Sequence, residues 1–192
     1  MGDSLITIVA IFLAAVLMFV FPLMSMSERT DDVSQLAVQT ATTEFVDKVR
    51  TTGNLTLEDY DKYVETISST GNAFDVNIEI QQLDENPGVK TTQAEMTKIG
   101  ENLYYNFYTS QVEAMLQENS KISLKEGDRI AVTATNTNQT ISQILKNFFY
   151  KIAGNDTYQI AARHSGIVTA KGTTKVNNIE YILRGYEDLG GK

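Results

Sequence analysis

The sequence contains one histidine, His164, and no other side chain is as well suited to acid–base chemistry near neutral pH. Its neighbour Ser165 suggests nucleophilic catalysis, in which an imidazole takes the proton of a hydroxyl group. The surrounding residues, however, have the pattern of a β-strand, and adjacent strand residues point to opposite faces of a sheet. The two side chains therefore cannot meet, and no Gly-x-Ser-x-Gly motif offers another nucleophile. We predict no catalytic residue and interpret His164 as a surface or sheet position.

Three groups of acidic residues could bind a cation, but each has another explanation. Asp31 and Asp32 follow the apolar N-terminal segment, where charged residues mark the end of a membrane span. Asp59 and Asp61 fall in the first turn of a predicted helix, where the helix dipole favours negative charge. The segment 84–86 lacks the spaced oxygen ligands and the glycine of a calcium loop. The sequence therefore predicts no metal site, and the absence of cysteine excludes thiolate ligands.

Phosphate and nucleic-acid recognition also find no support in the sequence. The C-terminal glycines Gly185, Gly190 and Gly191 lack the strand-to-helix setting of a phosphate-binding loop. The net charge is −8 and Lys and Arg form no cluster, whereas nucleic-acid binding depends on a basic patch. We therefore expect no cofactor and no nucleic-acid partner.

Helices and strands alternate along residues 30–168, which indicates an α+β fold. A helix over 30–52 ends at Gly53, because glycine followed by asparagine is a helix stop signal. A second helix follows Thr56, whose hydroxyl is placed to cap it. Apolar and polar residues alternate over 74–81, which predicts a strand. The segment 99–118 is predicted as a helix, although Tyr104, Tyr105 and Tyr108 leave its first half open between helix and strand. The remaining predicted elements are strands over 121–125, 129–135 and 158–168 with a bulge or bend at Gly166, a helix from Thr140 to Gly154, and an edge strand over 179–183.

The helix that begins at Thr140 has the strongest amphipathic pattern outside the N-terminal segment. Its apolar residues recur three or four positions apart and so share one face of a helix. They are Ile141, Ile144, Leu145, Phe148, Phe149 and Ile152. The order of all these elements indicates a mostly antiparallel sheet packed on helices.

The N-terminus must position everything else, because Leu5 to Met24 form an uncharged run of twenty residues. As a helix this run is about 30 Å long, which matches the hydrocarbon core of a bilayer. A cleaved signal peptide is disfavoured, because residues 1–4 contain no Lys or Arg and only a weak Ser-x-Ser cleavage site follows the run. Arg29 is the only basic residue near either end, so charge does not decide the topology.

We therefore expect two parts. The first is a single-pass transmembrane helix at 1–27. The second is one α+β head at 28–192, whose helix 30–52 continues from the anchor.

Six residues of the apolar run are candidate contacts with lipid or with other helices. Large aromatic side chains can face acyl chains or insert between neighbouring helices, and a small alanine lets a neighbouring helix approach closely. A proline bends a membrane helix but is tolerated there. Lipid contact alone explains these residues as well as helix packing does. The candidates are Leu5, Ile8, Phe12, Ala15, Phe19 and Pro22.

Three stretches carry a resemblance: MGDSLITIVAIFLAAVLMFVFPL at 1–23, TATTEFVDKVRTTGNLTLEDYDKYVETISSTGNAFDV at 40–76, and TISQILKNFFYKI with YQIAARHSGIV within 140–168. An apolar N-terminal helix that continues into an amphipathic helix and a small α+β head resembles the type IV pilin plan. The chain is similar to the TadE-like pseudopilins of tight-adherence pili in Gram-positive bacteria. Pilins carry an acid at the fifth mature position, where this chain has Leu5. The chain is therefore either already processed or an ordinary single-pass anchor.

The resemblance implies a structural, non-enzymatic subunit of a surface filament or of a secretion or conjugation-type complex, with its head outside the cell. It implies contact with membrane lipid, with further copies and with other pilin-like subunits. A separate assembly ATPase would supply the energy, since the chain has no Walker motif. The alternative is a single-pass, membrane-tethered extracytoplasmic binding module.

Overall fold

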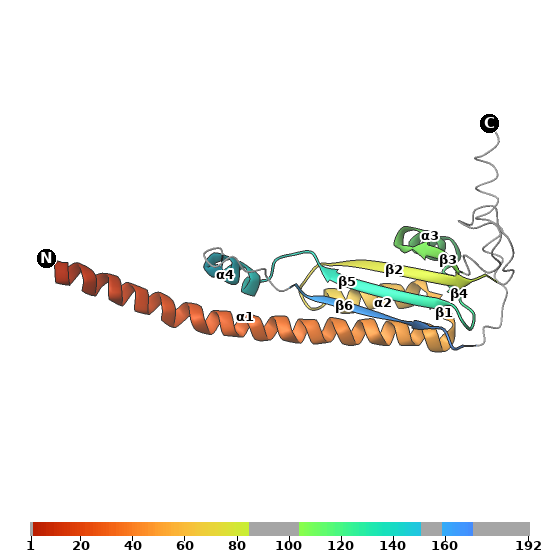
Figure 1. Ribbon diagram of the computed structural model, residues 1–192, viewed down its shortest axis with the longest axis horizontal. Coiled ribbons are helices and arrows are strands. Elements are labelled where there is room, and N and C mark those ends of the chain that lie inside the picture. The colour runs from red at the N-terminus through yellow and green to blue at the C-terminus, as the bar shows by residue number, and fades with distance from the viewer. Residues whose placement is uncertain (1, 85–103, 151–158, 171–192) are drawn as a thin grey trace, which may run out of the picture.

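One long helix and a small sheet dominate this computed structural model, which describes residues 2–84, 104–150 and 159–170 (Figure 1). Helix α1 (Gly2–Thr52) starts at one end of the molecule, and the strands all lie beside its C-terminal half. The other elements are β1 (Asn54–Thr56), α2 (Leu57–Ser68), β2 (Phe74–Leu83), β3 (Tyr104–Tyr108), α3 (Thr109–Asn119), β4 (Lys121–Ser123), β5 (Arg129–Asn136), α4 (Ile141–Tyr150) and β6 (Ala161–Ile167).

Helix α1 is continuous from the apolar segment into the head, as predicted for residues 30–52. Pro22 lies inside the helix without ending it, and its 51 residues span about 76 Å at 1.5 Å per residue. The helix ends because Gly53 adopts a left-handed conformation with φ 67°, and its N–H donates to the Val49 carbonyl at 2.8 Å. A side chain at Gly53 would meet the Leu124 carbonyl oxygen at 3.0 Å, so this position requires glycine.

The main sheet has four antiparallel strands in the order β3-β2-β5-β6. Its register places Ile80 opposite Ile130 and Ala134 opposite Ala162, so the apolar positions of neighbouring strands align on one face. This face packs against α1 and α2 (Figure 1). The other face is mostly polar. The two-stranded pair of β1 and β4 joins the end of α1 to the segment after α3. The predicted α+β class with an antiparallel sheet is confirmed.

The core lies between the sheet and the C-terminal half of α1. Val46 and Val49 of α1 are fully buried, and the Phe45 ring stacks on the Tyr63 ring of α2 with their centroids 4.6 Å apart. The Tyr63 hydroxyl lies 3.0 Å from the hydroxyl of Thr42, so this buried polar group keeps a hydrogen-bond partner. The head thus uses the second half of α1 as its central helix.

Over residues 104–108, where the sequence leaves helix and strand open, the structure has a strand and not the start of the predicted helix. Residues 104–108 form strand β3, which pairs with β2, and helix α3 begins only at Thr109. Four of these five residues are Tyr or Phe, which favour strands, and the open edge of β2 gives them a partner. Pairing between segments distant in sequence therefore overrode the helical spacing.

The bulge or bend predicted at Gly166 is also wrong, because β6 pairs residue for residue with β5 from Ala161 to Ile167. The glycine has another cause: a Cβ atom there would lie 2.3 Å from Nε of Arg50. Other predictions fall outside the described residues. These are the start of the 99–118 helix, the helix end at Gly154, the strand over 179–183 and the glycines Gly185, Gly190 and Gly191.

Candidate functional site

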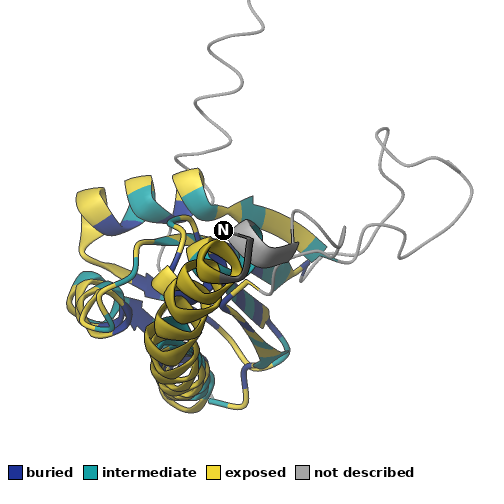
Figure 2. Cartoon of the chain, turned by 90° about the vertical axis from the view of Figure 1, so that its left-hand side faces the viewer, coloured by how far each residue is buried: buried dark blue, intermediate teal, exposed yellow. Residues whose placement is uncertain are grey.

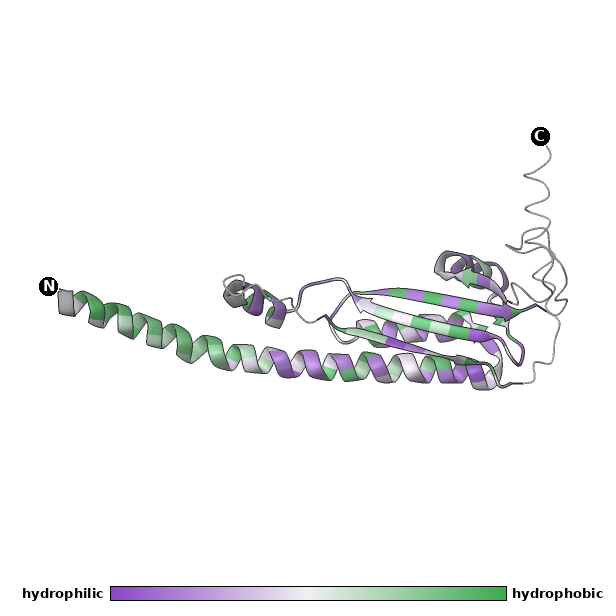
Figure 3. Ribbon diagram, in the orientation of Figure 1, coloured by the Kyte–Doolittle hydropathy of each residue, from purple (hydrophilic) through white to green (hydrophobic). Residues whose placement is uncertain are grey.

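The N-terminal half of α1 contains the apolar run over 5–24 and extends away from the head (Figure 1). We call this run the apolar rod. Among the described residues it belongs to one helix that is long and apolar enough to cross a membrane, and none of its most apolar window is buried. Figure 2, which looks from the N-terminal side, shows this part of α1 as exposed, and Figure 3 shows its change from apolar to mixed character near the head. Within residues 5–24 the side chains are exposed except at Val20 and Met24, which are partly covered.

The six candidate contact residues all lie on this rod and are all exposed. Their successive spacings are three, four, three, four and three residues, so they form one stripe that turns slowly around the helix, by about 20° per seven residues. A stripe with this repeat is typical of a seam between helices, although the rest of the circumference is apolar as well. The residues are Leu5, Ile8, Phe12, Ala15, Phe19 and Pro22.

The same stripe continues beyond the apolar run, which sequence reasoning missed. Met26, Val33 and Leu36 follow the same repeat, interrupted only by Arg29. Val33 is 68% exposed and Leu36 is 65% exposed, although both lie beside the head. At 100° per residue they face away from Val38 and the core. The seven-residue spacing could have revealed the stripe, but only the fold shows which side of α1 the head covers.

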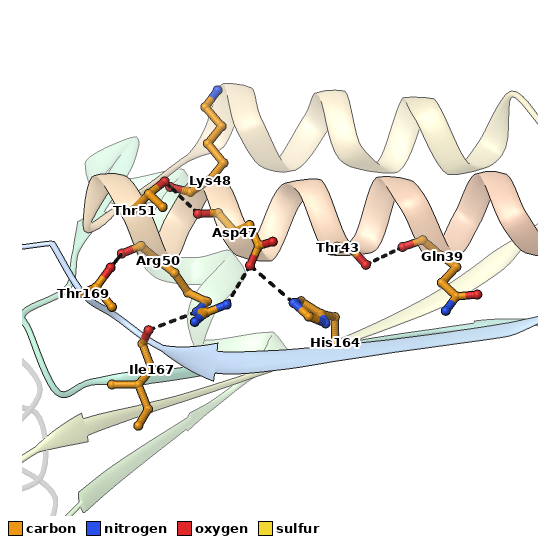
Figure 4. Close-up of polar contacts among 9 residues, drawn as sticks. All are labelled: Gln39, Thr43, Asp47, Lys48, Arg50, Thr51, His164, Ile167 and Thr169. Atoms are coloured by element: carbon orange, nitrogen blue, oxygen red, sulfur yellow. Dashed lines mark hydrogen bonds and ion pairs between the residues drawn. The ribbon is translucent and has the colours of Figure 1, made fainter.

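Polar contacts near the end of α1 fix the head to this helix (Figure 4). Arg50 donates from Nη1 to Oδ1 of Asp47 at 2.7 Å and from Nε to the Ile167 carbonyl at 3.0 Å. The backbone N–H groups of Thr169 and Ala170 both donate to the Arg50 carbonyl, at 3.0 and 3.2 Å. These bonds satisfy a carbonyl in the last helical turn and hold the end of β6 against α1.

A second contact fixes the other end of β6. The side chain of Gln35 donates from Nε2 to the Ala161 carbonyl at 2.6 Å, and the Ala161 N–H donates back to Oε1 at 3.0 Å. A side-chain amide thus replaces a neighbouring strand at this edge. Because α1 holds β6 at both Ala161 and Ile167, the head resists sliding and rotation relative to the apolar rod.

His164 lies between these two contacts, on the face of β6 that is turned towards α1. Its Nε2 atom is 3.4 Å from Oδ1 of Asp47, which also accepts a hydrogen bond from Arg50 (Figure 4). Ser165 is exposed on the other face of the strand. The two side chains do not meet, so their adjacency in sequence creates no catalytic pair.

Two of the acidic residues noted in the sequence, Asp31 and Asp59, make contacts within the chain. Oδ2 of Asp31 accepts a hydrogen bond from the Thr140 hydroxyl at 2.7 Å, and Asp59 forms an ion pair with Lys48. Burial acts to raise the pKa of Asp59, but hydrogen bonds from Lys48 and Thr56 outweigh it and hold the pKa below 3.8. Across the described residues, no group of three or more His, Asp or Glu side chains is arranged to hold a metal ion.

The outer face of the sheet carries a surface hollow of about 420 Å³. Its lining combines both charges with an aromatic side chain, since it includes Glu79, Arg163 and Tyr108. The start of α3 closes one side of the hollow. This surface could recognise a polar ligand or a partner loop.

Three features of the described chain therefore bear on function. They are the exposed rod, its stripe and the rigid join to the head. No family model, no curated protein and no solved structure matches this chain.

Proposed function

We propose that the protein is a membrane-anchored, non-enzymatic structural subunit of the pilin-like kind, which assembles side by side with other copies through α1. In this proposal, residues 5–24 cross the membrane once and the head lies outside the cell. The observation that carries the proposal is the exposed apolar stripe that continues past the span to Val33 and Leu36.

Lipid cannot cover this continuation. Val33 lies nine residues beyond Met24 and Leu36 lies twelve residues beyond it. At 1.5 Å per residue these side chains are about 14 and 18 Å outside the hydrocarbon core, whereas the headgroup layer is only about 5–8 Å thick. A neighbouring helix with the same repeat can cover both the membrane part and the head part of the stripe.

The anchor can serve in both settings because an apolar helix packs as well against similar helices as against acyl chains. Moving a subunit from the bilayer into an assembly therefore exchanges one apolar environment for another. The rigid join at Gln35 and Arg50 would then give every head a defined orientation along the assembly. A separate ATPase would drive the transfer in this proposal.

Single-cysteine crosslinking tests the proposal directly, because the natural chain contains no cysteine. We would compare Leu36→Cys on the stripe with Glu65→Cys on the exposed side of α2, both in the full-length chain in native membranes. Leu36→Cys is expected to form disulfide-linked dimers on mild oxidation, and Glu65→Cys is expected to remain monomeric. Equal crosslinking at both positions, or none at Leu36, would contradict assembly through this face.

A tethered binding module is the second candidate function, and the hollow between the outer sheet face and α3 favours it. This function needs only the head, so a chain without residues 1–27 would still bind its partner. In that case Arg163→Glu would weaken binding, since the substitution reverses a charge in the lining. A structural subunit behaves differently, because its assembly is lost together with the apolar helix.

A further inference from the structure

Helix α4 turns polar side chains inwards and apolar side chains outwards, which is the reverse of a helix packed on a soluble protein. Ser142 and Gln143 are buried, at 1% and 8% exposure, while Ile141 is 67% exposed and Ile144 is 53% exposed. A helix on a water-exposed protein surface normally turns its apolar side inwards and its polar side outwards. The outer face of α4 is therefore suited to an apolar environment.

Two side-chain contacts fix the position of α4 along α1. The Thr140 hydroxyl donates to Oδ2 of Asp31 at 2.7 Å, and Nζ of Lys146 lies 3.0 Å from Oε1 of Glu28. A later residue of α4 thus contacts an earlier residue of α1. The two helices run in opposite directions, and α4 leads from the head towards the apolar rod. Figure 1 shows α4 beside α1, displaced from the sheet towards the N-terminus.

This position corresponds to the interface between lipid and water if residues 5–24 cross the membrane. Glu28 lies four residues beyond Met24, which is about 6 Å along the helix axis. The headgroup layer extends about 5–8 Å beyond the hydrocarbon core. The middle of α4 therefore lies within this layer, and its last turn lies at the edge of the hydrocarbon.

We propose that α4 is an interfacial helix that inserts Ile144 into the headgroup region of the same membrane that α1 crosses, with Ile141 at the outer edge of this region. Interfacial helices bury their apolar face about 5–10 Å into this boundary. The inference rests on the membrane anchoring in the proposed function. It adds a second point of contact, which would fix the tilt of the head over the bilayer and its rotation about α1.

A second copy is a less suitable occupant for this face. Glu28 and Asp31 lie on the same side of α1 as Val38, which faces the head core. The stripe that includes Val33 and Leu36 lies on the opposite side of α1. A neighbour bound to the stripe would therefore leave α4 uncovered, whereas the bilayer surface surrounds α1 on every side.

The test uses the full-length protein in vesicles of phosphatidylcholine with phosphatidylglycerol. A polarity-sensitive fluorophore is attached to single cysteines in three separate variants, Ile144→Cys on α4, Phe12→Cys in the span and Glu65→Cys on α2. The vesicles are prepared with and without lipids that carry a quencher near the headgroup. Circular dichroism melts check that each labelled variant keeps the fold of the head.

We expect a blue shift and quenching by the shallow lipid quencher at position 144, a blue shift at position 12, and the emission of a water-exposed dye at position 65. A water-like signal at 144 with a blue shift at 12 would overturn the interfacial helix but leave the anchor intact. A blue shift at 144 without lipid quenching would mean that protein covers α4, which also overturns the inference. A water-like signal at position 12 would overturn the membrane anchoring itself.

Discussion

Arg50 and Gly166 show how a single residue pair joins helix α1 to the sheet of the head. The Arg50 guanidinium crosses β6 at the one position where no side chain stands in its way, since a Cβ at Gly166 would lie 2.3 Å from Nε. Gly166→Ala should displace Arg50 and remove its charge-assisted hydrogen bond to the Ile167 carbonyl, worth about 1.5–3 kcal/mol. Replacing glycine by alanine in a strand raises the free energy of unfolding by about 0.5–1 kcal/mol. Urea denaturation of the full chain in mild detergent should therefore show a net loss of about 1–2 kcal/mol.

The Arg50→Ala background provides the control for this prediction. There the guanidinium is absent, so Gly166→Ala should cost nothing or stabilise the chain slightly. Ser165→Ala, on the exposed face of the same strand, should leave the stability unchanged. A cost for Gly166→Ala that is the same in both backgrounds would show that Arg50 is not the reason for the glycine.

The Asp59 carboxylate makes the stability of the head depend on pH. Its pKa is held below 3.8 by Lys48 and Thr56, against the opposing effect of burial. The unfolded chain binds this proton more readily, so the contribution of Asp59 is complete above about pH 4 and disappears as the pH falls through the lower folded-state value. Thermal melts between pH 5 and pH 2.5 should show a steeper loss of stability in the natural chain than in Asp59→Asn. Parallel curves for the two chains would contradict this prediction.

At the scale of elements, the two sides of α1 within the head have different surroundings. Its inner side in the head is fully buried at Val46, while its outer side is 65% exposed at Leu36. Val46→Ala should lower the free energy of unfolding by about 2 kcal/mol, because it removes buried methyl groups and leaves a cavity. Leu36→Ala should leave the stability of the isolated subunit within about 0.5 kcal/mol. Denaturant unfolding of both variants in detergent checks this difference, and equal losses would mean that the assignment of the two sides is wrong.

Elements with local signals could be predicted from the sequence. The start of α2 follows from Thr56, whose hydroxyl accepts a hydrogen bond from the Asp59 N–H at 3.1 Å, and the end of α1 follows from Gly53. Strands β2 and β5 show clear alternation of apolar and polar residues. Strand β3 could be predicted only as an alternative to a helix, because residues 104–108 become a strand by pairing with the distant edge of β2.

The candidate site was predictable only in part for the same reason. The apolar run over 5–24 is visible in the sequence, and so are the apolar residues of α4. The sequence does not reveal that Val33 and Leu36 face away from the head, or that α4 turns Ile144 outwards. Those facts depend on which side of each helix the sheet and α1 cover, and this is decided by the tertiary fold.

At the scale of the whole molecule, the apolar rod and the head are joined by one helix but stabilised separately. The rod makes no contribution to the core, since the buried residues of α1 begin at Ser34. A change in the rod should therefore alter membrane insertion without altering the fold of the head. Ala15 is close to the middle of the proposed span, so Ala15→Arg would place a charge at the depth where it costs about 2.5–3.5 kcal/mol.

This cost corresponds to a decrease of about 70- to 400-fold in the equilibrium between the inserted and the free chain. The fraction of protein that resists carbonate extraction from membranes should fall sharply for Ala15→Arg and remain high for the matched variant Ala15→Leu. The melting temperature of the head, followed by circular dichroism in detergent, should be the same for both variants. If Ala15→Arg also lowered this temperature, residues 5–24 would have to pack against the head. The rod would then be part of the core instead of a surface that contacts lipid or neighbouring helices.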